Sequence, residues 1–422
     1  MLKALGNVFK VKELRDKVLF MLAMMAVYRL GAHIPVPGVD VALLQERLFG
    51  GNFGGALDFL DLFAGGALSN FTIFAMSITP YITASIILQL LTVVIPKLEE
   101  LSKQGNEGRK KIAQYTRYGT IVLAVIQAVG ITLYIQRFGA VPNASVFDIA
   151  LIIVSLTAGT AFLMWLGEQI TDKGIGNGIS IIIFTSIISR FPSDMYNTYE
   201  LLQAGTISIL NILIFAVLAI IIIAGIIFVQ QGERRIPVQY SKRIVGRRVY
   251  GGRSTHIPMK INQAGVIPVI FASSVLLFPG IIAQVLPYDW AAGLANAISP
   301  GSTLYMVLYG LMILFFTYFY TAITFNPEEV ADNMKKYGGF IPGIRPGRPT
   351  INYLDKVLMR VTLAGAVFLT IVALLPFAMQ PLTGVTISFG GTSLIIMVGV
   401  ALKTMEQIES HLLMRHYEGF MK

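Results

Sequence analysis

The chain has 422 residues, of which 55% are apolar and only 13% are charged. Soluble domains carry about 25% charged residues, so this chain lacks the charge that would cover its surface in water. The composition excludes a soluble globular enzyme, and it excludes disorder, which requires low hydrophobicity and high charge. The absence of cysteine excludes disulfides, thiolate metal sites and a cysteine nucleophile. The sequence therefore predicts a protein whose solvent is lipid.

Ten long apolar runs recur along the chain, and most reach the roughly 20 residues that a helix needs to cross a bilayer. The fifth run is short, but Gly178 and Phe191 can lengthen it. Alternating ten-residue segments, which are typical of membrane β-barrels, do not occur in the sequence. We therefore expect an all-α polytopic membrane protein with ten transmembrane helices. The runs occupy residues 18–35, 71–95, 118–135, 149–166, 179–189, 207–229, 261–286, 304–325, 361–377 and 385–402.

The basic residues gather on one side of this predicted topology. Ten spans place both termini on the same side, and that side then holds 29 of the 33 Lys and Arg residues. Only Arg29, Arg47, Arg137 and Arg190 fall on the other side. By the positive-inside rule, this asymmetry predicts that both termini are cytoplasmic.

The predicted spans hold almost no ionisable side chains. Pumps and ion-coupled carriers usually keep a charged group near the membrane midplane. The four histidines fall in loops, span ends or tails, and the sequence has no P-loop, HExxH or GxSxG motif. We therefore expect no enzyme, no cofactor and no metal site. A channel and a secondary transporter of a neutral solute both remain open.

Two spans are interrupted at matching positions of the two halves. The second span follows an amphipathic stretch at residues 57–69 that is too short to cross, and Pro80 is expected to interrupt the span itself. Paired interruptions indicate a transport path, although Gly and Pro are also common in ordinary membrane helices. In the seventh span, the interrupting residues are Gly265, Pro268, Pro279 and Gly280.

Isoleucines recur every four residues in the second and fifth spans, at Ile78, Ile82 and Ile86 and at Ile179, Ile183 and Ile187. This spacing places each set on one helical face. Such stripes usually contact lipid or neighbouring helices. The functional alternative is an apolar constriction, which blocks ions by dewetting.

Two loops on the basic side are longer than topology requires. Residues 230–260 hold eight basic residues against one acid, interleaved with apolar residues in a way that predicts a two-stranded ribbon. Residues 326–360 contain a stiff tip, rich in Gly and Pro, at 338–349. The charges could serve only topology and contact with anionic lipids. The alternative is docking of an acidic protein surface or of ribosomal RNA phosphates.

Several motifs resemble those of the SecY/Sec61-alpha family of protein-conducting channels, and the resemblance covers nearly the whole chain. They are IPVPG at 34–38, AGGALS at 64–69, TPYITASII at 79–87, GRKK at 108–111, QYTRYG at 114–119, WLGEQITDKGIGNGIS at 165–180, STHIP at 254–258, AGVIP at 264–268, FNP at 325–327 and PGIRPG at 342–347.

The resemblance implies a clamshell of two inverted five-helix halves around an hourglass pore, closed by a short half-helix plug at about residues 57–70. The implied pore ring consists of Ile78, Ile82, Ile179, Ile183, Ile270 and Ile396. The implied plug residues are Phe59, Leu60, Leu62, Phe63, Gly65, Gly66 and Leu68. The second and third spans would face the seventh and eighth across a lateral gate, whose polar positions are Thr83, Gln89 and Asn262.

The resemblance also implies a domain scheme. A cytoplasmic segment at 1–17 precedes the N-terminal half at 18–190, and an external hinge loop at 191–205 leads to the C-terminal half at 206–402. The C-terminal half carries the cytoplasmic loops 230–260 and 326–360, and a cytoplasmic tail follows at 403–422.

The implied function is translocation of unfolded preproteins across the bacterial cytoplasmic membrane, with lateral release of hydrophobic segments into lipid. The implied partners are the small membrane subunits SecE and SecG, the SecA motor ATPase, the ribosome, preproteins with their signal peptides, and anionic lipids. The implied partner-binding residues are Arg243, Arg247, Arg248 and Arg345.

Overall fold

The computed structural model describes residues 11–46, 61, 63–137, 139–141, 145–240, 243–245, 248–250, 254–285, 293, 297–299, 301–383 and 391–419. Each predicted apolar run overlaps one helix in this part of the chain, so the all-α class is confirmed. These helices are α2 (Lys12–Gly31), α5 (Thr79–Val94), α7 (Asn106–Arg137), α8 (Val146–Lys173), α9 (Gly178–Gln203), α10 (Ile209–Gln231), α11 (Ile267–Val285), α13 (Thr303–Thr324), α15 (Arg348–Thr383) and α16 (Gly391–Gly419).

Shorter helices connect these elements: α3 (Val41–Leu44), α6 (Pro96–Lys103) and α14 (Pro327–Lys336). Among the described residues, five helices are long and apolar enough to cross a membrane by themselves, namely those at α7, α8, α10, α13 and α15. The pair α5 and α6 adds a sixth candidate that is bent by 101°. The protein is therefore a multi-pass membrane protein.

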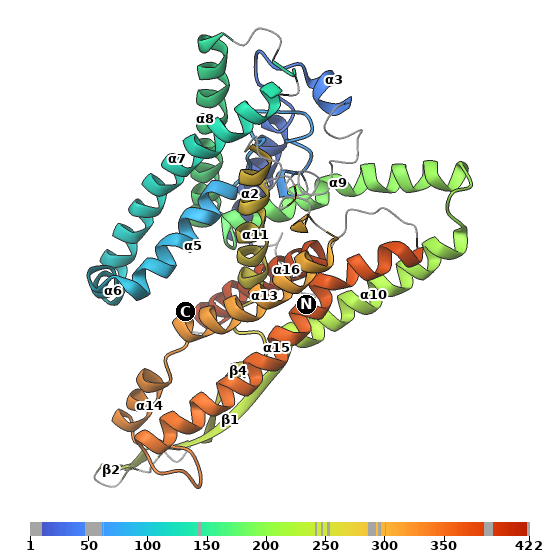
Figure 1. Ribbon diagram of the computed structural model, residues 1–422. Coiled ribbons are helices and arrows are strands. Elements are labelled where there is room, and N and C mark those ends of the chain that lie inside the picture. Colours follow the sequence, from blue (N-terminus) through green and yellow to red (C-terminus); the bar gives the residue numbers. More distant parts are fainter. Residues whose placement is uncertain are drawn as a thin grey trace.

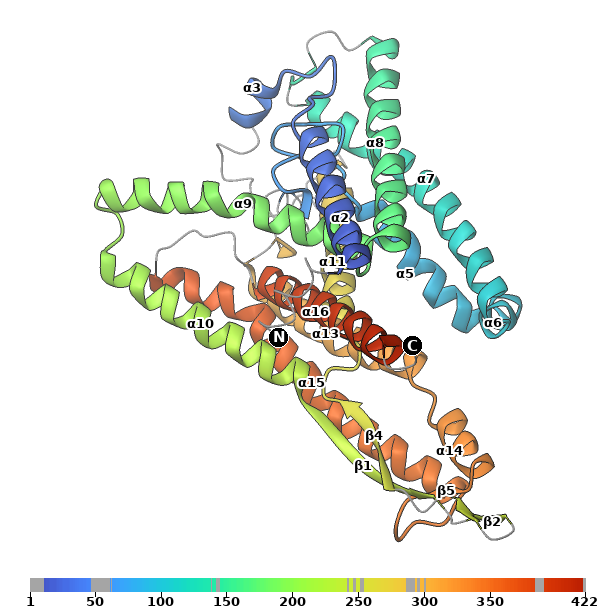
Figure 2. The ribbon, with the colours of Figure 1, turned by 180° about the vertical axis from the view of Figure 1, so that it is seen from behind.

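The helices form two groups. In the first, α2 packs on α8 and α9, and α5, α7, α8 and α9 pack in succession. In the second, α11, α13, α15 and α16 pack in succession, and α10 packs on α15 and α16. Helix α11 also contacts α5 and α7, and α16 contacts α9. Figure 1 shows the two groups with α11 between them, and Figure 2 shows the same arrangement from behind.

Proline positions decide where two of these helices begin. We expected Pro80 to interrupt the second span, but it lies in the first turn of α5, where its missing N–H leaves no hydrogen bond unmade. The preceding residues 65–78 form turns instead. Pro268 is likewise the second residue of α11, and this helix continues through Pro279 and Gly280, which we expected to interrupt it.

The hinge loop predicted at 191–205 is mostly helical. Helix α9 continues through Gln203 with Pro192 inside it, and the chain turns only at residues 204–208. The predicted tail is also helical, because α16 runs to Gly419. Hydropathy marks where apolar side chains end, and polar residues can continue a helix beyond that point.

The predicted ribbon is present and has a third strand. Strand β1 (Glu233–Tyr240) pairs antiparallel with β4 (Ser254–Lys260), with Ile236 opposite Ile257. The second basic loop contributes β5 (Gly339–Phe340), which pairs with β1. Strands β2 (Arg243–Val245) and β3 (Arg248–Tyr250) form a separate hairpin.

One apolar core joins the two basic loops. Ile236, Val238 and Met259 of the sheet pack in a cluster with Met334 of α14 and Leu354 of α15. We call β1–β5, α14, the tip at 341–347 and the first turns of α15 the loop lobe, which projects from one end of the molecule in Figure 1. The two loops therefore form one folded body.

Close backbone packing between α8 and the turn before α5 yields a stability prediction. A Cβ at Gly159 would overlap the carbonyl oxygen of Ile73, whereas a Cβ at Gly130 of α7 would meet no atom within 4 Å. We expect Gly159→Ala to destabilise the fold by about 1–3 kcal/mol, because backbone cannot move aside cheaply. We expect Gly130→Ala to unfold at the parental temperature. Thermal unfolding in detergent measures both, and equal midpoints for the two variants would contradict this packing.

Candidate functional site

Six isoleucines from both groups of helices meet in one apolar cluster. Ile78, Ile183 and Ile396 are 1%, 3% and 0% exposed, and Ile270 is also buried. Ile82 and Ile179 pack against the cluster from its margin. The residues come from the start of α5 and from α9, α11 and α16. Branched apolar side chains offer an ion no ligand, so a pore lined by such a cluster would oppose the passage of ions.

Close packing of α8 on α9 positions the isoleucines of the fifth span. A Cβ at Gly178 would overlap the carbonyl oxygen of Gly167, so the start of α9 lies directly against the α8 backbone. The Gly178 N–H donates to Thr171 Oγ1 at 2.8 Å, and Asn177 caps the helix by accepting from the Ser180 N–H. These contacts fix where Ile179 and Ile183 project.

The described part of the predicted plug is buried but barely helical. Phe63 and Leu68 are buried, whereas Phe59, Leu60 and Leu62 lie outside the described residues. Gly65 and Gly66 have φ values of 65° and 86°. The expected half-helix is therefore wrong for residues 65–70, because this left-handed backbone replaces helix by turns.

Polar contacts, which the sequence reasoning missed, hold this segment against α9. Asp61 is 1% exposed, and its Oδ2 lies 3.2 Å from Arg190 Nη1. Its Oδ1 accepts from the Leu68 and Ser69 N–H groups at 2.9 and 3.0 Å. A signal was available, because Arg190 is one of only four basic residues on its side of the predicted topology. An isolated arginine there has no role in topology and needs another explanation.

Two of the predicted gate residues, Thr83 and Gln89, lie on α5, which contacts α11, whereas Asn262 precedes α11 and lies beside Gly365 of α15. Thr83 is buried, and its hydroxyl donates to the Thr79 carbonyl at 3.0 Å. Asn262 Nδ2 donates to the Gly265 carbonyl at 2.9 Å. Gln89 Oε1 and Asn262 Oδ1 are buried without a partner among the described residues. An unmade buried hydrogen bond costs about 1–3 kcal/mol, so each of these atoms destabilises the packing around it.

The predicted partner-binding residues lie in the loop lobe. Arg345 is exposed at a tip where Gly343 and Gly347 have φ values of 81° and 100°. Thr350 holds the tip by donating its hydroxyl to the Arg345 carbonyl at 2.9 Å. Arg243 lies in β2 and Arg248 in β3, whereas Arg247 falls outside the described residues. One body thus carries basic residues from both loops.

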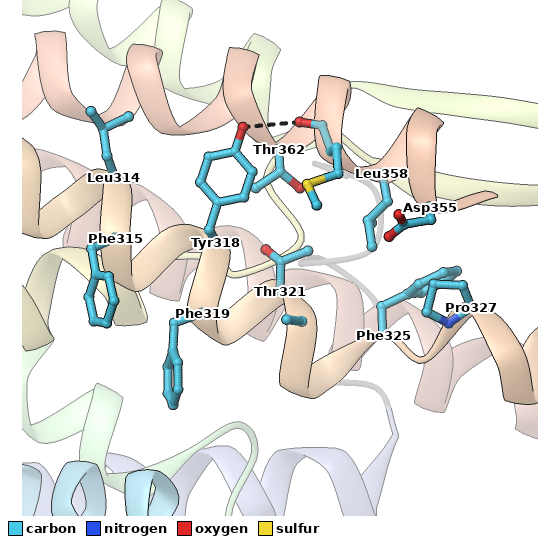
Figure 3. A pocket seen from close by; sticks show the side chains of 12 residues that line it. Leu314, Phe315, Tyr318, Phe319, Thr321, Phe325, Pro327, Asp355, Leu358 and Thr362 are labelled. Atoms are coloured by element: carbon cyan, nitrogen blue, oxygen red, sulfur yellow. Dashed lines mark hydrogen bonds between the residues drawn. The ribbon is translucent and has the colours of Figure 1, made fainter. Parts of the chain in front are cut away.

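An apolar pocket of about 570 Å³ lies between α13 and α15, away from all of these residues. Figure 3 shows its side chains, with Tyr318 donating to the Met359 carbonyl at 3.2 Å. Aromatic side chains of α13 line one wall, and Leu358 and Asp355 belong to the other. None of the residues predicted for the pore, plug or gate lines this pocket.

Comparisons with known proteins agree with this geometry. The family model described as SecY matches residues 72–405. A relative named protein translocase subunit SecY, from Thermotoga maritima, is 48% identical over 430 residues, covering 100% of this chain and 98% of the relative. The protein of the same name from Streptomyces coelicolor is 49% identical over 442 residues, covering 100% of both chains.

Solved structures of low sequence identity share the fold. One, titled the structure of a protein conducting channel, has a TM-score of 0.67 at 18% identity and covers 94% of this chain and 92% of its own. Another, titled Sec61 in the canine ribosome-channel complex, has a TM-score of 0.62 at 17% identity with the same coverage. A third title names a plug domain that stabilises the closed state, and its TM-score is 0.68 at 18% identity, covering 94% of this chain and 92% of that chain.

The isoleucine cluster predicts an ion leak when it is widened. We expect Ile82→Gly combined with Ile183→Gly to raise the ion conductance of resting vesicles about tenfold or more. Removing these side chains would widen the constriction, which we call the isoleucine neck, and water would then enter it and carry ions. The matched control is Ile214→Gly with Ile220→Gly on the exposed face of α10, which makes the same chemical change in a helix. The fluorescence of an ion indicator trapped inside the vesicles measures the leak. Ion-tight vesicles from the first double variant would show that the cluster is ordinary packing.

Proposed function

Because the chain belongs to the SecY family of protein translocase subunits, we propose that it forms a channel for unfolded preproteins in the cytoplasmic membrane. The carrying observation is the cluster in which isoleucines of four helices, drawn from both groups, meet beside the buried plug segment. Such an apolar neck can yield to a passing chain without binding it. The neutral-solute transporter finds no support among the relatives, which are named translocase subunits.

The seam between α5 and α11 is the proposed lateral gate for hydrophobic segments. It is the place where the first helix group meets α11 of the second. The amide oxygens of Gln89, on α5, and of Asn262, shortly before α11, are buried and find no partner among the described residues. An apolar segment that leaves the pore here enters lipid without a charged group in its way.

The loop lobe is the proposed docking site for the driving partner, the SecA motor ATPase or the ribosome. Two solved structures of the same fold are described as ribosome complexes, canine Sec61 and yeast Ssh1. Exposed arginine suits both an acidic protein surface and ribosomal phosphates. Both termini are then cytoplasmic, on the side of the lobe. SecE and SecG are the proposed small membrane partners, and the chain itself catalyses no reaction.

The direct test is ATP-driven translocation of a preprotein into proteoliposomes. The chain is reconstituted with the two small subunits, and the motor ATPase and ATP are added outside. Protection of the preprotein from added protease measures its entry into the vesicle. We expect protection that depends on the chain and on ATP, and its absence would contradict the proposal.

The plug assignment predicts a channel that loses selectivity rather than activity. We expect deletion of residues 59–67 to leave a folded protein that translocates preproteins, including those with defective signal sequences. The physical reason is that the segment fills space beside the neck and is tied down mainly by side chains. Translocation of normal and signal-defective preproteins is measured side by side. An unfolded or fully inactive protein would show that the segment belongs to the structural core.

The fixed tip around Arg345 predicts that its chemistry matters beyond its charge. We expect Arg345→Lys to impair translocation and Arg345→Glu to reduce it thirtyfold or more, because losing one charge-assisted interface contact costs about 2–5 kcal/mol. Lysine lacks the planar fork of donors. The control is Arg348→Glu, the same charge change at an exposed position in the same loop. Translocation rates are compared at equal channel density. A parental rate for the Arg345→Glu protein would show that Arg345 is not needed for docking and serves only topology.

A further inference from the structure

Two side chains at the end of α2 hold the backbone of the plug segment. Tyr28 is fully buried, and its hydroxyl donates to the Ala64 carbonyl at 3.1 Å. The same hydroxyl lies 2.6 Å from Ser186 Oγ of α9. Arg29 Nη1 donates to the Gly65 carbonyl at 3.1 Å and to Ser189 Oγ at 2.9 Å. The adjacent plug carbonyls are therefore bound by neighbouring residues of α2, each braced by a serine of α9.

The Asp61 carboxylate adds a charged contact to α9 and also binds the plug backbone beyond Gly65 and Gly66. Its side chain is 2% exposed, that of Arg190 is 22% exposed, and their ion pair spans 3.2 Å. The other carboxylate oxygen accepts from the backbone N–H groups of Leu68 and Ser69. Asp61 therefore closes the segment into a loop and ties that loop to α9. Removing one partner of a buried pair leaves the other charge uncompensated, which is costly.

Backbone packing at Gly65 shows that this docking is close. A Cβ at Gly65 would lie 2.9 Å from both Cα and the carbonyl oxygen of Ser186, and the residue has a φ of 65°. The plug backbone thus lies directly against the α9 backbone. Only glycine satisfies both the left-handed conformation and the space.

These contacts share one property that bears on gating. Their partners, Tyr28 and Arg29 on α2 and Ser186, Ser189 and Arg190 on α9, all belong to the first helix group. Among the described residues, helix α11, on the other side of the proposed gate, supplies none of these polar contacts, although its Ile270 belongs to the same apolar cluster as Phe63 and Leu68. Separating α11 from α5 and α7 would therefore leave these polar contacts of the plug intact.

We propose that Tyr28, Arg29, Asp61, Ser186, Ser189 and Arg190 form a latch that positions the plug on the first helix group. The plug leaves when the latch breaks, and opening of the gate seam does not by itself release it. The six side chains are positioning residues for the seal. The inference rests on the proposed channel function and adds the residues that regulate its closed state.

The test uses a single introduced cysteine as a reporter. The chain has no cysteine of its own, so all labelling of the chain comes from the reporter. Leu68→Cys places a thiol in the buried plug segment, where it is smaller than the side chain it replaces. A membrane-impermeant maleimide is added to proteoliposomes, on the face opposite the loop lobe. We expect Arg190→Gln and Tyr28→Phe each to raise the labelling rate about tenfold, because each removes a contact of the docked state.

Matched variants separate the latch from general stability. Arg117→Gln breaks the 2.6 Å ion pair with Glu168 elsewhere in the same helix group. In this variant, the cysteine introduced by Leu68→Cys should react with the maleimide at the parental rate. Tyr28→Phe keeps the ring that stacks on Phe74 at 5.9 Å, so it tests the latch even where Arg190→Gln fails to fold. Parental labelling of the Tyr28→Phe protein would overturn the latch.

A second readout distinguishes positioning from structure. Latch variants should increase translocation of preproteins with defective signal sequences, whereas a merely structural defect lowers translocation of every substrate. Translocation by the parent protein distinguishes a failure of the latch from a failure of the proposed channel function. The latch alone is contradicted if the parent translocates preproteins and the latch variants match it both in maleimide labelling rate and in rejection of signal-defective preproteins. A parent that never translocates contradicts the proposed function.

Discussion

Apolar packing of isoleucines from α5, α9, α11 and α16 is the interaction on which the rest of the structure depends. It joins the two helix groups at the middle of the molecule, where a charged or polar neck would conduct ions or hold a passing peptide. An apolar contact of this kind has no directional bonds, so it can open and close again without leaving unmade hydrogen bonds. In the proposed channel, the same apolar character would make the seal reversible and would exclude ions.

Polar contacts are distributed unevenly around this apolar centre. Between the plug segment and α9, the buried Asp61 is fully engaged with Arg190 and two backbone N–H groups. Elsewhere, Gln89 of α5, Asn262 before α11 and the Tyr305 and Tyr309 hydroxyls of α13 have buried oxygens without partners among the described residues. Satisfied polar groups fix a geometry, and unsatisfied ones lower the cost of separating the surfaces that carry them. The plug segment is thus held firmly on α9.

Hydropathy and alternation were enough to predict the helices and the ribbon, and motif positions were enough to bring six isoleucines together. Helix ends could not be predicted, because α9 continues to Gln203 through polar residues that hydropathy does not register. The pairing of β5 with β1 joins loops that are distant in sequence, and the two residues of β5 carry no strand pattern. The Asp61–Arg190 pair was missed for the same reason: its members are 129 residues apart, and only the odd location of Arg190 hinted at a partner.

Chain connectivity links the loop lobe to the seam. Strand β4 ends at Lys260, and α11 begins at Ile267, so the sheet of the proposed docking site is joined by a short connection to the helix of the proposed gate. The connection is held closely, because a Cβ at Gly365 of α15 would overlap the Ile261 carbonyl oxygen. Lys260 is also paired with Glu406 of α16 at 3.1 Å. A load on the rigid tip of the lobe therefore reaches α11 and α16, two helices of the isoleucine neck, while the plug remains bound to α2 and α9. Force from a partner acts first on the seam and the neck, and the plug responds only when its own polar contacts give way.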